Sequence, residues 1–161
     1  MSKNSAVVVL HEQATNSLVL TQRSMHLREH PGEICFPGGR WEAGDTDLWS
    51  TALRELQEEL GINPERVRLL KELAPEHTLR GHKIYPWLAT ISRLDPYTAN
   101  ENEVTSVLTI PMNEVITHSN YKRVVVTRYG FSVVTSQFTA SDHFVWGATA
   151  RIMKQLCITK G

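Results

Sequence analysis

The sequence predicts an α/β fold in which helices flank a mixed β-sheet. Segments rich in β-branched and aromatic residues alternate with segments of helical periodicity along the 161 residues. A chain of this length can bury about 70% of its unfolded surface without disulfide support. No stretch rich in Pro, Gly or Ser divides the sequence, and it contains no internal repeat. We therefore expect one domain over residues 1–161, with flexible ends at about 1–5 and 158–161.

The first part of the chain is expected to form strands and a glycine turn. Residues 6–10 and 18–22 are β-rich runs separated by the turn-forming pair Thr15 and Asn16, which indicates a hairpin or adjacent strands. Residues 33–36 are also strand-like, and they lead into a sharp loop at residues 37–39. Two glycines there permit positive φ angles and the close approach of a ligand or metal to the backbone.

The next element is a helix with capping residues at both ends. Residues 45–47 (Asp-Thr-Asp) can cap its first turn, and Gly61 followed by Asn63 and Pro64 can end it. Its apolar stripe, which would anchor the helix to a core, consists of Trp49, Leu53, Leu56 and Leu60.

Three carboxylates share the opposite side of this helix. Glu55, Glu58 and Glu59 fall within a sector of about 100°, where like charges oppose helix formation by roughly 0.2–0.5 kcal/mol per pair. Near the helix C-terminus the macrodipole disfavours them as well. A bound divalent cation would reverse this repulsion, because Mg²⁺ takes carboxylate oxygens together with substrate phosphate oxygens. The alternative is a solvated acidic surface.

The second half of the chain is expected to alternate strands with two helices. Strands are predicted at residues 67–74, 83–92, 104–110, 121–128, 131–135 and 143–146. A short helix would open at residues 111–115 and a final one would span residues 147–157, while Gly130 supplies a turn. Together these elements predict one mixed sheet with flanking helices.

Charge and hydropathy exclude several classes of partner. The formal net charge is zero, from 17 basic and 17 acidic residues, so no global field attracts nucleic acid or an anionic membrane. The apolar run at residues 6–10 is too short for a signal-peptide core or a membrane span. We therefore expect a cytoplasmic protein with a small-molecule partner, and the sequence leaves monomer or homodimer open.

The glycine turn and the acidic helix together resemble the Nudix box, which would cover about residues 38–62. The matching residues are Gly39, Arg54, Glu55, Leu56, Glu58, Glu59, Gly61 and Ile62. The loop is one residue longer than in the general box, because Arg54 lies nine residues after Asp45 instead of eight. Glu42, Asp45 and Asp47 are all near enough in sequence to pair with Arg54.

An upstream segment resembles the motif that accompanies the Nudix box in the coenzyme A diphosphatase subfamily. The matching residues are Arg23, Ser24, Arg28, Gly32 and the Phe-Pro-Gly-Gly run at 36–39. The longer loop before Arg54 is also a trait of that subfamily. With later landmarks at residues 102–104 and 145–150, the resemblance covers about residues 6–157.

The resemblance implies an α/β/α sandwich and a hydrolase that uses Mg²⁺ or Mn²⁺. The reaction implied is cleavage of the diphosphate linkage of coenzyme A or its derivatives, giving 4′-phosphopantetheine, or its acyl form, and adenosine 3′,5′-bisphosphate. One alternative is a Nudix hydrolase of another nucleoside diphosphate derivative, such as ADP-ribose or a dinucleotide. A second alternative is a non-catalytic nucleotide-binding domain on the same fold.

The same resemblance assigns expected roles at the site. Glu55, Glu59 and Glu58 are the expected metal ligands, with the Gly39 carbonyl as a further ligand by analogy with relatives. Independently of the resemblance, Arg54 lies beside Glu58 in the helical projection and is expected to organise the acidic cluster, with a contact to substrate as the alternative. For the general base we favour Glu103, which follows a polar, loop-like stretch, with Glu58 as the other candidate. A solvated glutamate at a strand end is the competing interpretation of Glu103.

Substrate contacts are expected from residues just upstream of the helix. Arg23 and Arg28 carry guanidinium groups that suit bidentate phosphate contacts, and Gly38 and Gly39 form the close-approach backbone. The 3′-phosphate of coenzyme A is a group that these arginines could bind. Surface salt bridges are the alternative role for either arginine.

Overall fold

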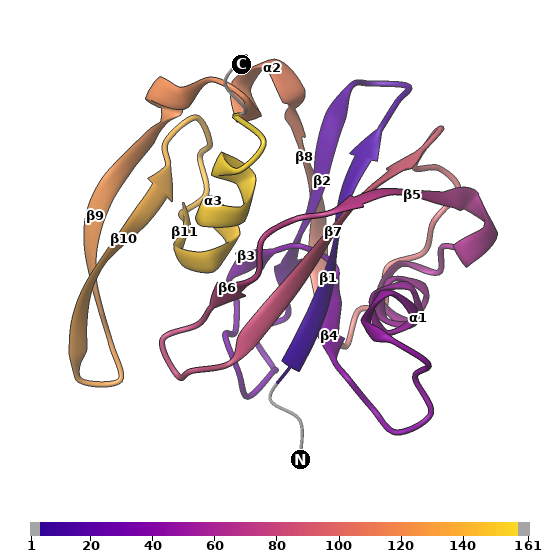
Figure 1. The fold of residues 1–161 in the computed structure, drawn as a ribbon, viewed down its shortest axis with the longest axis horizontal. Coiled ribbons are helices and arrows are strands. Elements are labelled where there is room, and N and C mark those ends of the chain that lie inside the picture. The colour runs from indigo at the N-terminus through magenta and orange to yellow at the C-terminus, as the bar shows by residue number, and fades with distance from the viewer. Residues whose placement is uncertain (1–3, 158–161) are drawn as a thin grey trace.

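In the computed structural model, which describes residues 4–157, two β-sheets and three α-helices form the fold (Figure 1). The larger, eight-stranded sheet contains β1 (Asn4–Glu12), β2 (Ser17–Arg23), β3 (Ile34–Cys35), β4 (Gly38–Arg40), β5 (Val67–Glu72), β6 (Glu76–His77), β7 (Lys83–Ile91) and β8 (Val104–Pro111). The smaller sheet contains β9 (Tyr121–Arg128), β10 (Phe131–Phe138) and β11 (Val145–Trp146). The helices are α1 (Leu48–Leu60), α2 (Met112–Val115) and α3 (Gly147–Lys154), with 3₁₀ turns at Pro64–Arg66 and His118–Asn120.

The larger sheet is mixed, as the sequence predicts. Its central strand β1 runs parallel to β7, with Ala6 opposite Tyr85, and antiparallel to β2 and β4. Most of β1 is buried because helices and loops cover both faces of the sheet. The α/β fold class is therefore confirmed.

The two main helices cover opposite sides of this sheet (Figure 1). Alternate residues of β1 point to opposite faces, so Val8 packs in the cluster that contains Leu56 of α1, and Val9 packs in the cluster that contains Met153 of α3. Each cluster is a buried apolar layer. This is the α/β/α layering that the sequence led us to expect.

The C-terminal strands differ from the prediction of one sheet. Strands β9, β10 and β11 pair only with one another, and α3 packs against β10 and β11. Figure 1 shows α3 lying between this small sheet and the large one, so the helix occupies the space in which the two sheets would otherwise pair. Strand β10 continues to Phe138, and α3 ends at Lys154 instead of reaching residue 157.

The structure describes part of the chain ends that were expected to be flexible. Asn4 and Ser5, which were expected to be flexible, begin β1 and lie opposite Lys83 and Ile84 of β7. The remaining terminal residues of that expectation, 1–3 and 158–161, lie outside the described residues. Within residues 4–157, no helix is long and apolar enough to cross a membrane.

Helix α1 begins and ends where its capping residues predict. The Asp47 carboxylate accepts a hydrogen bond from the Ser50 amide at 2.8 Å. Gly61 adopts the left-handed conformation at φ 65°, and its amide donates to the Gln57 carbonyl at 2.8 Å. Of the predicted apolar stripe, Leu56 and Leu60 are fully buried, which fixes the rotation of the helix on the sheet.

Candidate active site

Three carboxylates converge beside the C-terminal half of α1. Glu55 and Glu59 come from α1, and Glu103 comes from the loop that leads into β8. One oxygen from each lies within 4.8 Å of the others. Glu55 and Glu59 are buried, at 9% and 6% exposure, so the alternative of a solvated acidic surface does not describe them. The structure therefore brings the predicted residue Glu103 to the two helical glutamates.

The loop before β8 reaches this position because it hydrogen-bonds to the end of α1. The amides of Thr98 and Asn100 donate to the carbonyls of Leu60 and Glu59 at 2.9 and 2.8 Å. These carbonyls have no partner within the helix, so the loop satisfies them. The Asn100 side chain also donates to Glu103 Oε2 at 2.9 Å, which orients that carboxylate toward α1.

The glycine segment forms a strand at this site instead of the expected sharp loop. Strand β4 pairs with β1, with Gly39 opposite Ala6. A Cβ atom on Gly39 would lie 2.5 Å from Cδ of Glu55, so a side chain there would displace the carboxylate. The backbone of Gly38 hydrogen-bonds to Glu59 and lowers the pKa of that carboxyl against the larger effect of its burial. Gly38 and Gly39 thus lie directly against the two buried glutamates.

Arg54 connects the loop before α1 to the acidic cluster. It donates to both oxygens of Asp45, from Nε at 2.9 Å and from Nη2 at 3.0 Å. Its Nη1 donates to Glu55 at 3.1 Å and to Glu58 at 3.2 Å. The guanidinium holds the pKa of Asp45 well below its usual range. Of the three possible acidic partners, Asp45 makes the bidentate pair, so the longer loop preserves this contact.

Glu58 lies apart from the other two helical carboxylates. Its side chain is 50% exposed and accepts from Arg54, and it is outside the group formed by Glu55, Glu59 and Glu103. A helical sector of about 100° is wide enough to extend from the buried edge of α1 to its exposed face. The structure therefore places this expected ligand and candidate base on the rim of the cluster.

Burial and mutual repulsion change the acidity of the two inner carboxyls. Burial, with help from Glu55 and Glu103, raises the pKa of Glu59 to about 9. Burial raises the pKa of Glu55 to about 7, although the Arg54 guanidinium opposes this rise. Crowded carboxylate oxygens with too little positive charge around them are the donor set that suits a hard divalent cation. The residues present therefore fit a Mg²⁺ or Mn²⁺ ion.

These raised pKa values predict how stability depends on pH without metal. The folded protein holds protons on Glu55 and Glu59 more tightly than the unfolded chain, whose glutamates have pKa values near 4.5. Their contribution to the free energy of unfolding is therefore greatest below about pH 4.5 and falls as the pH rises toward 9. In EDTA, the Tm of wild type should fall relative to that of Glu59→Gln between pH 5.5 and 8.5, and Mg²⁺ should restore it. A constant Tm difference across this range would contradict the prediction.

The two predicted substrate arginines differ in position. Arg23 donates from Nε to the Glu29 carbonyl at 3.1 Å, and its charge is close enough to lower the pKa of Glu59. Arg28 is exposed and makes no hydrogen bond or ion pair with another residue in the described range 4–157. The structure thus places the Arg23 charge near Glu59, while the role predicted for Arg28 stays a prediction.

Sequence reasoning missed two residues that support the site. Asn100 orients Glu103, and the buried Thr51 donates to Asp45 Oδ2 at 2.8 Å. Asn100 lies three residues before Glu103, a spacing at which a side chain can bond back to the chain in a turn. Nothing in the pattern around Thr51 distinguishes it from any helical threonine facing a core.

An α/β/α sandwich with an acidic helix packed on a glycine strand is the arrangement expected of hydrolases that act on phosphoanhydride bonds. The chain belongs to the Nudix family, because the family model for the NUDIX domain matches residues 1–129. Nudix hydrolases generally use divalent metals, and the acidic cluster agrees with that property.

Relatives and solved structures agree with this membership. A protein of Escherichia coli O7:K1 named uncharacterized Nudix hydrolase NudL is 36% identical over 144 residues, which are 89% of this chain and 75% of that protein. The protein of the same name from Citrobacter koseri is 35% identical, and the match spans 100% of this chain and 85% of the relative.

Two solved structures share the fold. A Caenorhabditis elegans Ap4A hydrolase complex has a TM-score of 0.59 at 21% identity, covering 70% of this chain and 83% of that one. The NUDIX domain of Shewanella oneidensis NrtR, solved with ADP ribose, has a TM-score of 0.56 at 22% identity, covering 72% of this chain and 77% of that one. At these identities the likeness shows the fold alone.

Proposed function

We propose that this Nudix hydrolase cleaves the diphosphate linkage of coenzyme A or its derivatives with the help of Mg²⁺ or Mn²⁺. The observation that carries the metal-dependent hydrolysis is the convergence of Glu55, Glu59 and Glu103 within 4.8 Å, against a glycine strand that leaves room for no side chain. Its products would be 4′-phosphopantetheine, or the acyl form, and adenosine 3′,5′-bisphosphate.

A diphosphate linkage resists water because water is a weak nucleophile and negative charge develops on both phosphoryl groups as the bond breaks. A divalent cation, when bound, neutralises phosphate oxygens and makes water more acidic. Glu55 and Glu59 would hold the cation from one edge of α1, with the Gly39 carbonyl as a further ligand. Arg54 would fix the Glu55 carboxylate through its 3.1 Å contact while remaining anchored to Asp45.

Glu103 is the group that we propose as the general base. Asn100 occupies its Oε2 with a hydrogen bond of 2.9 Å, and no side chain donates to Oε1 among the described residues. Oε1 could therefore take a proton from water as the water oxygen bonds to one phosphorus and the bridging oxygen leaves with the other phosphoryl group. Glu58, on the exposed rim, is the other candidate for this role.

The choice of coenzyme A rests on the segment from Arg23 to Gly39. This segment carries the motif that resembles the coenzyme A diphosphatase subfamily, and it contributes both β4 and the Arg23 charge to the wall of the acidic cluster. ADP-ribose is the second candidate substrate, because one structural neighbour was solved in complex with it.

A substrate panel tests the proposal. Coenzyme A, acetyl-coenzyme A, ADP-ribose and a diadenosine polyphosphate would each be incubated with the protein and Mg²⁺, then Mn²⁺, and the products separated by chromatography. We expect coenzyme A or its acetyl derivative to give the highest kcat/KM, with adenosine 3′,5′-bisphosphate as a product. Rapid cleavage of ADP-ribose with no action on either coenzyme A compound would overturn the proposal.

A further inference from the structure

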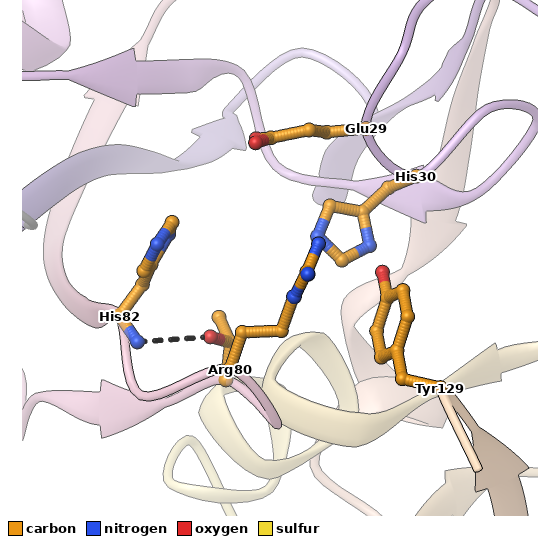
Figure 2. A pocket seen from close by; sticks show the side chains of 6 residues that line it. Glu29, His30, Arg80, His82 and Tyr129 are labelled. Atoms are coloured by element: carbon orange, nitrogen blue, oxygen red, sulfur yellow. Dashed lines mark hydrogen bonds between the residues drawn. The ribbon is translucent and has the colours of Figure 1, made fainter.

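A pocket with a volume of about 290 Å³ lies between three segments that are distant in the sequence. Its lining residues are Glu29, His30, Thr78, Arg80, His82 and Tyr129. Glu29 and His30 come from the segment between β2 and β3, the next three from the loop between β6 and β7, and Tyr129 from the turn between β9 and β10. Figure 2 shows Arg80 extending toward His30, with His82 and Tyr129 on either side.

The pocket presents positive charge and hydrogen-bond donors. Arg80 forms no ion pair with any carboxylate in residues 4–157, and its guanidinium lies over the Tyr129 ring, 4.5 Å from the centroid. The one carboxylate in the lining, Glu29, is already paired with Arg40 through contacts of 3.0 and 2.9 Å. A guanidinium held over a ring in this way still has N–H groups available for an anion.

Two lining residues hold an unusual backbone conformation. His30 and Tyr129 each have a φ of 53°, and they are two of the three non-glycine residues with positive φ in the described chain. L-residues adopt this conformation uncommonly. At Tyr129 the two-residue hairpin turn Tyr129–Gly130 between β9 and β10 requires it. At both positions the side chain lines the pocket beside Arg80 (Figure 2).

A series of hydrogen bonds connects the pocket lining to the acidic cluster. Arg40 binds Glu29 with its side chain, and its carbonyl accepts from Arg54 Nη2 at 3.0 Å. Arg54 in turn donates to Glu55 of the acidic cluster. Arg23, whose charge acts on Glu59, donates to the carbonyl of Glu29. The side chains of Arg40 and Arg23 therefore link the pocket lining to the residues around the acidic cluster.

We propose that this pocket binds a phosphomonoester carried on a nucleoside, and that in the substrate this group is the 3′-phosphate of the adenosine end of coenzyme A. The naming of coenzyme A rests on the proposed function. Arg80 would make the bidentate contact. The His82 imidazole and Nε2 of His30, whose Nδ1 already lies 3.1 Å from Glu33, would donate the remaining hydrogen bonds. Such a contact distinguishes coenzyme A from ADP-ribose and from 3′-dephospho-coenzyme A, which lack this phosphate.

Steady-state kinetics with paired substrates test the assignment. Arg80→Gln should raise the KM for coenzyme A at least ~10-fold, the size expected for a lost charge-assisted hydrogen bond, with kcat within about twofold of wild type. Its kinetics with 3′-dephospho-coenzyme A should stay unchanged. Arg80→Lys keeps the charge but lacks the planar fork of N–H donors. Its KM for coenzyme A should therefore lie between those of wild type and Arg80→Gln. Equal effects on both substrates, or no effect on either, would refute the pocket as the phosphate subsite.

The matched control is Arg68→Gln, which removes the same charge from the exposed surface of β5. It should leave the kinetics with both substrates unchanged. An equal KM increase for coenzyme A in Arg68→Gln would mean that general charge, and not the pocket, attracts the substrate.

Direct binding separates this inference from the proposed function. Calorimetry with adenosine 3′,5′-bisphosphate and with adenosine 5′-monophosphate needs no turnover. If the bisphosphate binds more tightly than the monophosphate and Arg80→Gln abolishes this difference, the pocket is supported even if coenzyme A is not cleaved. Equal binding of the two nucleotides refutes it even if coenzyme A is the best substrate.

Discussion

Replacing Glu59 with Gln is expected to lower kcat by at least about 10³-fold, which corresponds to roughly 4 kcal/mol of transition-state stabilisation. Glu59 is 6% exposed and contributes one of the three converging oxygens. The amide has the shape of the carboxylate but carries no charge, so it is a poor ligand for a divalent cation. The rate measured with coenzyme A and Mg²⁺ would show this loss.

The fold should survive this substitution. Burial raises the pKa of Glu59 to about 9, so the metal-free protein holds a neutral carboxyl there at neutral pH, and a neutral amide replaces it at little cost. We expect circular dichroism to be unchanged and the metal-free Tm at pH 8.5 to equal or exceed that of wild type. Glu72→Gln, an exposed change on β5, is the charge-matched control and should keep full activity. Full activity in Glu59→Gln would refute its role as a metal ligand.

Gly39→Ala should lower activity by about 100-fold through the loss of space for one carboxylate. The added Cβ would lie 2.5 Å from Cδ and 2.6 Å from Oε2 of Glu55, so the carboxylate or β4 must move. Overpacking of this kind costs about 1–3 kcal/mol of stability, and a shift of ligand oxygens weakens the metal site further. The activity should fall more steeply at low Mg²⁺ than at saturating Mg²⁺, which a metal titration of the rate would measure.

Gly44→Ala is the control that separates the clash with Glu55 from the backbone strain of replacing a glycine that has a positive φ. Gly44 has a φ of 104°, and a Cβ there would meet no atom within 4 Å. An alanine at this position should lower the Tm because an L-residue rarely adopts that backbone conformation, yet it should leave kcat unchanged. If Gly39→Ala and Gly44→Ala lost equal activity, the close approach of Gly39 to Glu55 would have no special importance.

Local patterns predict helix α1 well. Its start at Asp47 and its end at Gly61 follow from capping chemistry, which depends on neighbours within a few residues. Strands β1, β2, β5, β7 and β8 also lie near the residue ranges predicted for them. The separate β9–β11 sheet was not predicted, because α3 lies between the two sheets and no local pattern encodes that separation.

In the site, too, local patterns predict some features and long-range contacts determine the others. Three- and four-residue spacing brings Glu55 and Glu59 together, but which edge of α1 is buried depends on contacts with β1 and β4. The approach of Glu103 depends on Asn100 bonding to the Glu59 carbonyl, a contact across 41 residues of sequence separation. The pocket around Arg80 joins three loops, so no single segment of the sequence indicates it.

The position of the bound cation tests the central claim most directly. Crystals grown with Mn²⁺ and measured at its absorption edge would locate the ion by anomalous scattering. We expect a peak about 2.0–2.5 Å from carboxylate oxygens of Glu55 and Glu59, with Glu103 within one water molecule of it. A peak bound by Glu58 on the exposed rim, or no peak beside α1 in crystals that still turn over substrate, would contradict the account.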